Sequence, residues 1–357
     1  MDGLNNLLYL YENVISKNVK NKKKVYYFER FKMMNIYEAY KIIESNRIEN
    51  VNYNIFLISE PKYRIVMSLN TVDKLVNHYV SKYYLEPKLS KYLIDNNVAT
   101  RVGMGTDYAI KKIKKFIELN KKYDRFYILK LDISKYFYSI DHEILLKMLK
   151  DKLSEKEYLI VKDILSTTNN LEINEEIKKI KEKYNIDEIN NIPYYEYGKG
   201  LPIGNMTSQF LSIFYLYELD HYIVHDLHIK YYIRYMDDFI LIHNDIDVLR
   251  NALEKIKDIL EKKYKLNVNL KKTKITNSKN GFVFLGYNFK VINKKTIIKI
   301  NNNALKKAKN NIKKRHYEYV TNKIDFNQAF CTYMTYRNSY KYASKMKLRN
   351  YLDKKWL

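Results

Sequence analysis

The strongest pattern in the chain is a pair of short apolar runs that meet at a doublet of acids. Residues 231–243 read YYIRYMDDFILIH, with apolar and aromatic side chains on both sides of Asp237 and Asp238. Two such runs joined by turn residues predict a β-hairpin with the acids at its turn. Adjacent carboxylates repel each other, and a magnesium ion, which prefers oxygen ligands, would offset that repulsion. The plainer interpretation is a turn favoured by aspartate chemistry alone.

A second apolar run supplies a third acid. Residues 126–131 have the pattern of a buried strand that ends at Asp132, and the residues after it predict a turn into a helix. Asp132 would then lie at the carboxyl end of a central strand and face the Asp237–Asp238 turn from a neighbouring strand. Three carboxylates at two strand ends suit a two-metal site for phosphoryl transfer. The third acid therefore favours the metal-site interpretation over the plain turn.

The spacing of apolar residues predicts the remaining elements. Helices are expected in the following ranges: 1–55 (interrupted by a basic loop at 18–24), 71–95, 107–119, 210–220, 248–264 and 300–357. Residues 56–70 predict two strands around a turn at Pro61, and residues 282–287 predict a strand and a turn. The Lys-, Glu- and Asn-rich stretch 151–198 lacks a motif, so we expect it to be a surface insertion.

Three blocks of this sequence resemble the catalytic motifs of reverse transcriptases. They are residues 126–142 around Asp132, residues 200–209 (GLPIGNMTSQ) and residues 235–238 (YMDD). They follow the family's order, and the resemblance covers about residues 55 to 345. It implies an α+β right-hand polymerase fold. We expect N-terminal helices and fingers over 1–125, a palm of antiparallel sheet and helices over 126–290, and a helical thumb over 291–357.

The resemblance also implies an activity and its cofactors. The expected enzyme is an RNA-directed DNA polymerase that copies an RNA template into cDNA by two-metal phosphoryl transfer. Its cofactors would be two Mg²⁺ ions, with Mn²⁺ as the alternative. The metal ligands implied are Asp132, Ile133, Asp237 and Asp238. Lys272 matches the family lysine that protonates the leaving pyrophosphate, so the expected catalytic residues are Asp132, Asp237, Asp238 and Lys272.

Further residues match positions that contact the incoming deoxynucleoside triphosphate. Arg64 corresponds to the basic residue that grips the triphosphate through fork-shaped hydrogen bonds, with Lys62 beside it. Phe137, five residues after Asp132, corresponds to the aromatic ring that excludes a ribose 2′-hydroxyl. The plainer alternatives are an arginine paired with a surface acid and an ordinary core aromatic.

Contacts to the RNA template and to the RNA/DNA duplex are implied in four places. Arg101, close to two glycines, lies in the region that follows the template, and Gln209 ends the second motif block. Leu285 and Gly286 belong to a block that resembles the family's grip on the primer end. The first helix after residue 300 is rich in Lys and Arg, which suits a thumb that follows the duplex backbone.

The resemblance implies that Ile203 and Gly204 also contact the incoming nucleotide, and the sequence of their loop indicates a particular biological role. Many reverse transcriptases carry Gln at the position of Ile203 and Ser-Pro at the position of Ser208 and Gln209. An Ile-Gly-x-x-x-Ser-Gln block resembles the polymerases of diversity-generating retroelements, which copy a structured RNA with errors at adenines and work with a small accessory protein. The alternative is a stand-alone antiphage-defence enzyme that copies an associated non-coding RNA. A third interpretation, an inactive RNA-binding protein, is disfavoured by the complete set of acids.

The composition restricts the classes of molecule that this protein is expected to bind. The 65 Lys and Arg residues outnumber the 40 Asp and Glu residues, which gives a formal net charge of +25 and favours a polyanionic partner. No apolar run reaches the roughly 18 residues of a membrane span, and the N-terminus lacks a secretion signal, so we expect a cytoplasmic protein without a membrane partner. The single cysteine, Cys331, excludes an internal disulfide framework, and we expect it to be buried.

Overall fold

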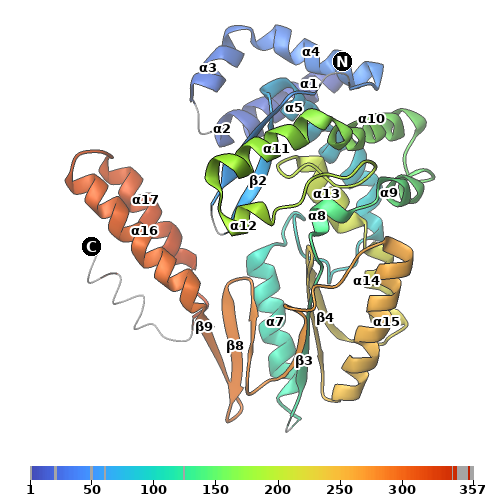
Figure 1. Cartoon of the computed structure of the whole chain (residues 1–357), viewed down its shortest axis with the longest axis vertical. Helices are drawn as coiled ribbons and strands as arrows, with labels where there is room; N and C mark the ends of the chain where they lie inside the picture. The colour runs from blue at the N-terminus through green and yellow to red at the C-terminus, as the bar shows by residue number, and fades with distance from the viewer. Residues whose placement is uncertain are drawn as a thin grey trace. The chain divides into compact units, whose positions relative to one another are not determined.

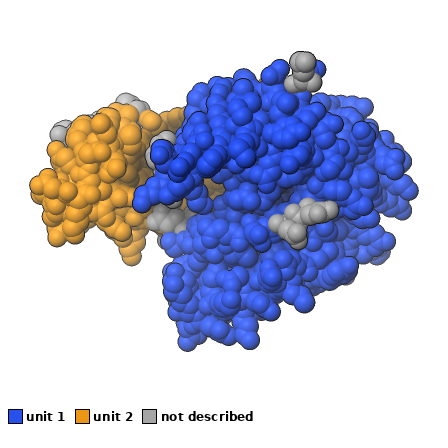
Figure 2. Space-filling model, turned by 90° about the horizontal axis from the view of Figure 1, so that it is seen from above, with its two compact units in different colours: residues 1–100, 133–226, 255–269 blue, residues 101–132, 227–254, 270–357 orange. Residues whose placement is uncertain are grey.

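The structure is a computed structural model that describes residues 2–19, 22–48, 51–59, 62–123, 125–339, 341–343 and 353 (Figure 1). The chain divides into two compact units, coloured separately in Figure 2. The first unit comprises Met1–Thr100, Ile133–Asp226 and Lys255–Asn269. The second comprises Arg101–Asp132, Leu227–Glu254 and Leu270–Leu357. Each unit is thus assembled from three separate stretches of the chain.

The first unit begins with helices whose apolar faces are buried. They are α1 (Asp2–Leu10), the π-helical turn η1 (Tyr11–Ile15), α2 (Ser16–Asn18), α3 (Lys22–Arg30) and α4 (Lys32–Ser45). Leu7 and Leu10 of α1 and Ile36 of α4 are buried, as the helical spacing of apolar residues requires. Helix α1 packs against α4, which extends the helical core of this unit.

A two-stranded hairpin follows these helices. Strands β1 (Tyr53–Ile58) and β2 (Arg64–Leu69) pair antiparallel over their whole length. The expected turn residue Pro61 lies outside the described residues, although the two expected strands are confirmed. Helix α5 (Thr71–Tyr79) starts directly after β2, because Asn70 accepts a hydrogen bond from the amide of Asp73 at 2.8 Å and caps the helix. The segment continues through η2 (Val80–Leu85), α6 (Glu86–Leu89) and η3 (Ser90–Tyr92).

The rest of the first unit is mainly helical. Its further helices are α8 (Tyr136–Ser139), α9 (His142–Leu149), α10 (Glu155–Ser166), η4 (Thr167–Asn169), α11 (Leu171–Tyr184), α12 (Asp187–Asn190), α13 (Met206–Phe214) and α14 (Tyr217–His225). The single helix expected over 210–220 is therefore two helices, separated at residues 215–216. Seven of the nine residues of α13 are buried, which places the second motif block against the core.

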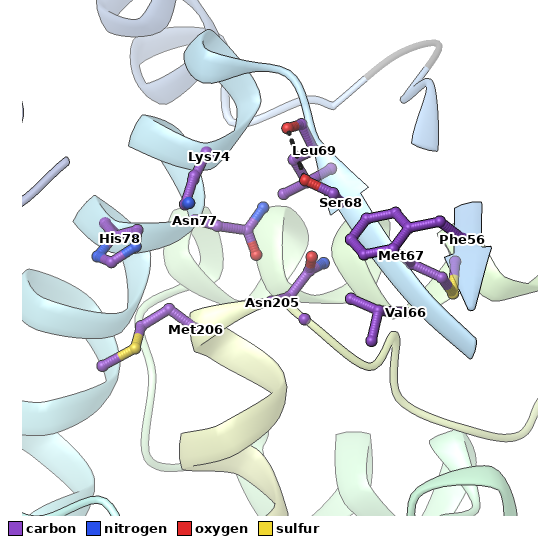
Figure 3. A pocket seen from close by; sticks show the side chains of 11 residues that line it. Phe56, Val66, Met67, Ser68, Leu69, Lys74, Asn77, His78, Asn205 and Met206 are labelled. Carbon is purple, nitrogen blue, oxygen red and sulfur yellow. Dashed lines mark hydrogen bonds between the residues drawn. The ribbon is translucent and has the colours of Figure 1, made fainter. Parts of the chain in front are cut away.

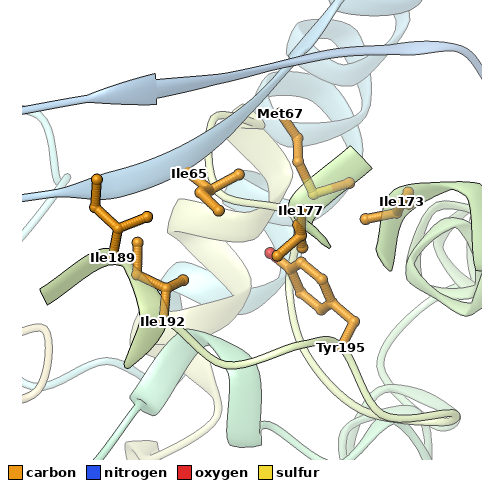
Figure 4. Packing of buried hydrophobic residues seen from close by; sticks show 7 residues of the cluster. All are labelled: Ile65, Met67, Ile173, Ile177, Ile189, Ile192 and Tyr195. Atoms are coloured by element: carbon orange, nitrogen blue, oxygen red, sulfur yellow. The ribbon is translucent and has the colours of Figure 1, made fainter. Parts of the chain in front are cut away.

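The stretch 151–198, expected to be a surface insertion, contributes to the core of the first unit instead. Ile173 and Ile177 of α11, together with Ile189, are buried in one cluster with Ile65 and Met67 of β2 (Figure 4). Ile192 and Tyr195 complete this cluster. The sequence analysis missed this cluster because the helix is rich in charged residues. Its buried isoleucines are four residues apart and share one face, and the charged residues fill the outer face. The stretch therefore supports β2 through side-chain packing.

The second unit is built on a four-stranded antiparallel sheet with the order β4-β5-β3-β6. The strands are β3 (Tyr127–Asp132), β4 (Tyr231–Tyr235), β5 (Asp238–His243) and β6 (Lys274–Asn277). Helix α7 (Thr106–Asn120) packs against β4. Helix α15 (Ile246–Tyr264) follows β5, and its residues from Lys255 onward belong to the first unit. Four consecutive residues of β5 are buried, which explains why this strand has a continuous apolar run in the sequence.

A second sheet and two helices complete this unit. Strands β7 (Phe282–Phe284), β8 (Tyr287–Ile292) and β9 (Lys295–Ile300) form an antiparallel meander, followed by α16 (Asn302–Val320) and α17 (Phe326–Ser339). Buried Ala308 and Ile312 of α16 and Tyr333 of α17 join the two helices. Cys331, expected to be buried, is exposed on α17. No helix in the described part of the chain is long and apolar enough to cross a membrane.

Candidate active site

The acid doublet lies at a tight turn that is supported by a buried arginine. The β4–β5 pairing ends at Tyr235 opposite Asp238, so Met236 and Asp237 form the two-residue turn, with Met236 at φ 57°. The side chain of Arg234 is fully buried beneath this turn. Its Nη1 donates a hydrogen bond to the carbonyl of Met236 at 3.0 Å. The buried guanidinium group thus holds the main chain that presents Asp237.

Asp132 and Asp238 are directly opposite each other on neighbouring strands. The β3–β5 register pairs their Cα atoms, so both side chains lie on the same face of the sheet. Their side chains are 10% and 21% exposed, respectively. Burial raises the pKa of Asp238 to about 6, and the negative charges of Asp237 and Asp132 add to this rise, while Lys130 opposes it. The site therefore concentrates negative charge at one end of the sheet.

Two lysines balance these carboxylates. Lys272 Nζ donates to Oδ1 and Oδ2 of Asp132 at 2.7 and 2.9 Å. Lys130 Nζ donates to Oδ2 of Asp238 at 3.1 Å. The amide of Asp132 also donates to Thr273 Oγ1 at 3.3 Å. The structure thus brings Lys272 to Asp132, while Lys130 and Thr273 are contacts that sequence reasoning missed.

The signal for Lys130 was present in the sequence. It is a charged residue inside an otherwise apolar strand and lies two positions before Asp132. Side chains two residues apart on a strand lie on the same face, so the position of Lys130 was sufficient to place it beside the acids.

The donor atoms at this site are of the type that binds a divalent cation. Oxygen ligands of closely spaced carboxylates are those that Mg²⁺ binds, and Oδ1 of Asp238 is buried without a hydrogen-bond donor among the described residues. As they stand, no three His, Cys, Asp or Glu side chains of the described residues converge closely enough to hold a metal ion. Lys272 and Lys130 occupy carboxylate oxygens of Asp132 and Asp238 instead. The side chain of Ile133 is buried, and its main chain bridges to Val268.

The residues expected to contact the nucleotide lie in the first unit, where one loop joins their elements. The amide of Leu201 donates to the carbonyl of Phe137 at 2.7 Å, and the amide of Met67 donates to the carbonyl of Ile203 at 2.8 Å. Gly204 has a φ of 127°, and a Cβ there would lie 2.5 Å from the Met67 carbonyl oxygen. The loop can therefore approach β2 this closely only with glycine at this position.

The side chains in this region are available to a ligand to different degrees. Arg64, at the start of β2, and Lys62 are both exposed. Phe137 is half-buried, whereas its neighbour Tyr136 is buried and donates its hydroxyl to the carbonyl of Ser212 at 2.5 Å. The core position in this pair of aromatics thus belongs to Tyr136, which leaves Phe137 as the candidate for contact with a sugar.

A cavity of about 200 Å³ adjoins Gly204 (Figure 3). Its walls come from β1, β2, α5 and the loop, and its lining residues are Phe56, Val66, Met67, Ser68, Leu69, Lys74, Asn77, His78, Gly204, Asn205 and Met206. Asn205 is 2% exposed and donates Nδ2 to the Tyr53 hydroxyl at 3.0 Å. Its Oδ1 is buried without a donor among the described residues. Burial lowers the pKa of His78 to about 4, and Lys74 adds to this effect. The cavity therefore offers neutral polar groups and one cation.

The remaining expected contacts are distributed over both units. In the first unit, Gln209 is half-buried on α13. In the second, Arg101 is half-buried, and Leu285 and Gly286 form the two-residue turn between β7 and β8 with φ values of 46° and 83°. A positive φ at both turn residues matches the twist of a tight hairpin and is unusual for leucine. The amide of Asn301 donates to the Gly286 carbonyl at 3.0 Å and fixes this turn to the start of α16.

Comparison with known sequences identifies the family. The sequence model described as "Reverse transcriptase (RNA-dependent DNA polymerase)" matches residues 58–289, more than half of the chain and all three motif blocks. This chain belongs to the reverse transcriptase family. The expected fold class, an α+β right-hand polymerase with an antiparallel palm sheet, is confirmed, and RNA-directed DNA polymerase is the enzyme class of this family.

Individual relatives are distant. Protein YkfC of Escherichia coli (strain K12) is 23% identical to this reverse transcriptase over 197 residues, which are 45% of this chain and 46% of YkfC. The chain thus spans about half the length of that curated relative. Among solved structures, apo telomerase from Candida tropicalis, truncated of its C-terminal domain, aligns with a TM-score of 0.47 at 15% identity over 76% of this chain and 60% of the telomerase chain. Telomerase from Candida albicans with a fragment of telomeric RNA aligns with a TM-score of 0.46 at 17% identity over 73% of this chain and 46% of that telomerase chain.

Proposed function

We propose that this protein is an RNA-directed DNA polymerase that copies an RNA template into cDNA. The observation that carries the proposal is the pairing of Asp132 with Asp238 across β3 and β5, beside the turn that presents Asp237. Asp132 and Asp237 would hold two Mg²⁺ ions, or Mn²⁺, with the main chain of Ile133 and the carboxylate of Asp238 nearby. When bound, the ions would lower the pKa of the primer 3′-hydroxyl and neutralise the triphosphate.

The chain's own residues position the reactants. Arg64, at the start of β2, and Lys62, two residues before it, are exposed and would bind the triphosphate oxygens of the incoming deoxynucleotide. The half-buried ring of Phe137 would lie against the sugar and leave no room for a 2′-hydroxyl. The main chain of Gly204, an exposed residue beside the cavity, would contact the incoming nucleotide. Lys272 Nζ would donate a proton to the leaving pyrophosphate.

Template and product would be held outside the chemical centre. Arg101 and Gln209 would contact the RNA template, and the turn of Leu285 and Gly286 would hold the primer end. The first helix after β9 carries a basic set that suits the phosphates of an RNA/DNA duplex, namely Lys306, Lys307, Lys309, Lys313, Lys314 and Arg315. The net charge of +25 supports such polyanionic partners.

For the biological role, we propose the polymerase of a diversity-generating retroelement. The support is Ile203, an apolar residue whose side chain cannot hydrogen-bond a sugar or base, in a loop fixed to β2 by the Met67–Ile203 bond. A structured template RNA and a small accessory protein would be its partners. The alternative is a stand-alone antiphage-defence reverse transcriptase that copies an associated non-coding RNA.

Primer extension tests the activity and the role together. The purified protein should extend a DNA primer on an RNA template with deoxynucleotides, lose this activity with a chelator, and regain it with Mg²⁺ or Mn²⁺. Absence of extension under both ions would contradict the polymerase proposal. Sequencing of the cDNA separates the two roles. Errors concentrated at template adenines, and reduced in the Ile203→Gln variant, support the diversifier, whereas accurate copying at adenines favours the defence enzyme.

A further inference from the structure

Lys130 makes two hydrogen bonds to two different parts of the second unit. Its Nζ donates to Oδ2 of Asp238 at 3.1 Å and to the main-chain carbonyl of Val283 at 2.8 Å. Asp238 belongs to the acid doublet, and Val283 lies in β7, directly before the turn of Leu285 and Gly286. The side chain of Lys130 is 17% exposed, so this bridge is largely shielded from water.

We propose that Lys130 is a positioning residue that fixes the spacing between the acid doublet and the β7–β8 turn. The proposal rests on the proposed function, in which the acids hold the metal ions and the turn holds the primer end. A polymerase must keep these two places at one separation, because the primer 3′-hydroxyl has to meet the metal-bound triphosphate in line. The residue has no counterpart among the catalytic positions that the motif blocks suggest.

The topology explains why a bridge is needed here. Strands β3 and β5 belong to the four-stranded sheet, whereas β7 is the edge strand of the separate β7-β8-β9 sheet. No strand ladder among the described residues connects the two sheets. The amide of Val291 in β8 donates to the carbonyl of Ser278, which follows β6, at 3.0 Å, and Lys130 adds a bond to β7 itself. An edge strand also presents main-chain groups without a ladder partner, and Lys130 supplies a donor to one of them.

The chemistry of the ammonium group suits this role. One lysine nitrogen carries three donors and no acceptor, so it can bond a carboxylate and a carbonyl at the same time. Its charge also offsets part of the repulsion among Asp238, Asp237 and Asp132. Lys272 differs, because its side chain is 46% exposed and both of its described hydrogen bonds go to Asp132. Lys130 thus joins two elements where Lys272 neutralises one acid.

The turn that Lys130 supports is itself fixed on its far side. The Gly286 carbonyl accepts a hydrogen bond from the amide of Asn301, which directly precedes α16. The hairpin is therefore held by Lys130 on the side of the acids and by Asn301 on the side of the helix. Loss of the Lys130 bond would leave the turn attached to α16 and free to shift away from Asp238.

Three substitutions separate the two bonds from the charge. Lys130→Met removes both bonds and the charge, Lys130→Gln keeps a donor without a charge, and Lys130→Arg keeps the charge. The matched control is Lys274→Met, because Lys274 is an exposed lysine directly opposite Lys130 in the β3–β6 ladder. Each variant is first compared with the wild type by thermal unfolding and by its dissociation constant for a primer–template duplex.

The deciding readout is the environment of the primer end without metal. A primer with 2-aminopurine at its 3′ terminus is bound in the presence of a chelator, and its fluorescence reports how the terminal base is held. We expect Lys130→Met to change this fluorescence and to lower the extension rate at saturating deoxynucleotide by about 10- to 100-fold, the cost of a small misplacement. The KM for deoxynucleotide and the duplex affinity should stay near the wild-type values, and Lys130→Arg should restore part of the rate.

Several results would overturn the inference. Unchanged fluorescence and rate in Lys130→Met would show that the bridge does not position the primer. An equal loss in Lys274→Met would show a general effect of removing a positive charge. If Lys130→Met does not fold, the comparison of Lys130→Arg with Lys130→Gln decides, and equal rates and fluorescence in both would contradict the proposal. Failure of the wild type to extend any primer would instead contradict the proposed function.

Discussion

The two units hold their candidate site residues by different physical means. In the second unit, Asp132 and Asp238 are opposed by strand register, and lysine side chains balance their charge. In the first unit, the loop with Ile203 and Gly204 is held through main-chain hydrogen bonds and through the absence of a side chain at Gly204. The site residues of the second unit depend on charged side chains, whereas the loop of the first unit depends on close approach of the main chain to β2.

This difference predicts different consequences of substitution. A carboxylate at a turn can lose its charge while the strands beneath it stay paired, so chemistry and stability are separable in the second unit. In the first unit, an added methyl group at Gly204 would push the loop away from β2, so stability and nucleotide contact should change together.

Asp237→Asn should give the largest effect. Asparagine has nearly the same shape but no charge, so bound metal ions would lose a carboxylate ligand while the β4–β5 hairpin keeps its turn. We expect primer extension to fall by about a thousandfold or more, because several kcal/mol of charge stabilisation are lost. Thermal unfolding and RNA binding should match the wild type. Extension at a near wild-type rate would remove Asp237 from the metal site.

Gly204→Ala should mainly reduce the stability of the protein, whereas Asp237→Asn should reduce activity without a loss of stability. The new Cβ would lie 2.5 Å from the Met67 carbonyl oxygen at a φ of 127°. We expect the free energy of unfolding to fall by about 2–4 kcal/mol, from strain and overpacking together. Gly198→Ala is the matched control, because Gly198 has a φ of 71° and its new Cβ would meet no heavy atom of the described residues within 4 Å, so about 1 kcal/mol is expected. Equal losses in denaturant unfolding would contradict the close-approach argument.

Phe137→Ala tests whether this half-buried ring contacts the nucleotide sugar or serves only in packing. The ring is half-buried and Tyr136 occupies the neighbouring core position, so the loss of stability should be modest. We expect incorporation of ribonucleotides relative to deoxynucleotides to rise by about tenfold in a competition assay, as for the loss of one steric contact. An unchanged ratio would return Phe137 to the role of a packing aromatic.

The smallest expected effect is a pH dependence of stability around the cavity in the first unit. The pKa of His78 is about 4 in the folded protein and about 6.5 in the unfolded chain, so its contribution to stability is present above pH 6.5 and is lost as the pH falls toward 4. Asp73 acts in the opposite direction, because burial raises its pKa to about 6 and stability is lost as the pH rises through that value. His78→Asn should therefore lose less stability than the wild type between pH 6.5 and 4. Parallel unfolding curves of the two proteins would contradict this assignment.

Much of the second unit was predictable from the sequence, because its elements are short and strongly patterned. The apolar runs before Asp132 and around Asp237 predicted β3, β4 and β5, and the structure confirms all three strands. Lys272 became a candidate catalytic residue only through the family resemblance, and its contact with Asp132, 140 residues earlier, was not predicted. No local pattern could have joined them.

The parts that sequence reasoning missed depend on contacts between distant segments. The bond from Lys130 to Val283 spans 153 residues, so its existence depends on where the second sheet packs. The cluster of Ile173 and Ile177 with Met67 likewise joins a charged helix to a strand about a hundred residues earlier. Cys331 was expected to be buried because cysteine is usually an interior residue, but it is exposed on α17, since residue type does not determine which side of a helix is covered.

The interleaved composition of the two units has a consequence for synthesis on the ribosome. The first unit needs residues up to Asn269, and the second needs residues after Leu270, so neither can be completed while the middle of the chain is still being translated. At about 5–20 residues per second, the 169 residues between Thr100 and Asn269 take roughly 8–34 seconds to add. In the first part of that interval, until Tyr184 has been added, the nascent β1–β2 hairpin lacks the α11 side chains that cover Ile65 and Met67. The emerging chain would therefore expose this apolar surface for part of its synthesis, and a fragment ending at residue 132 would contain the whole of neither unit.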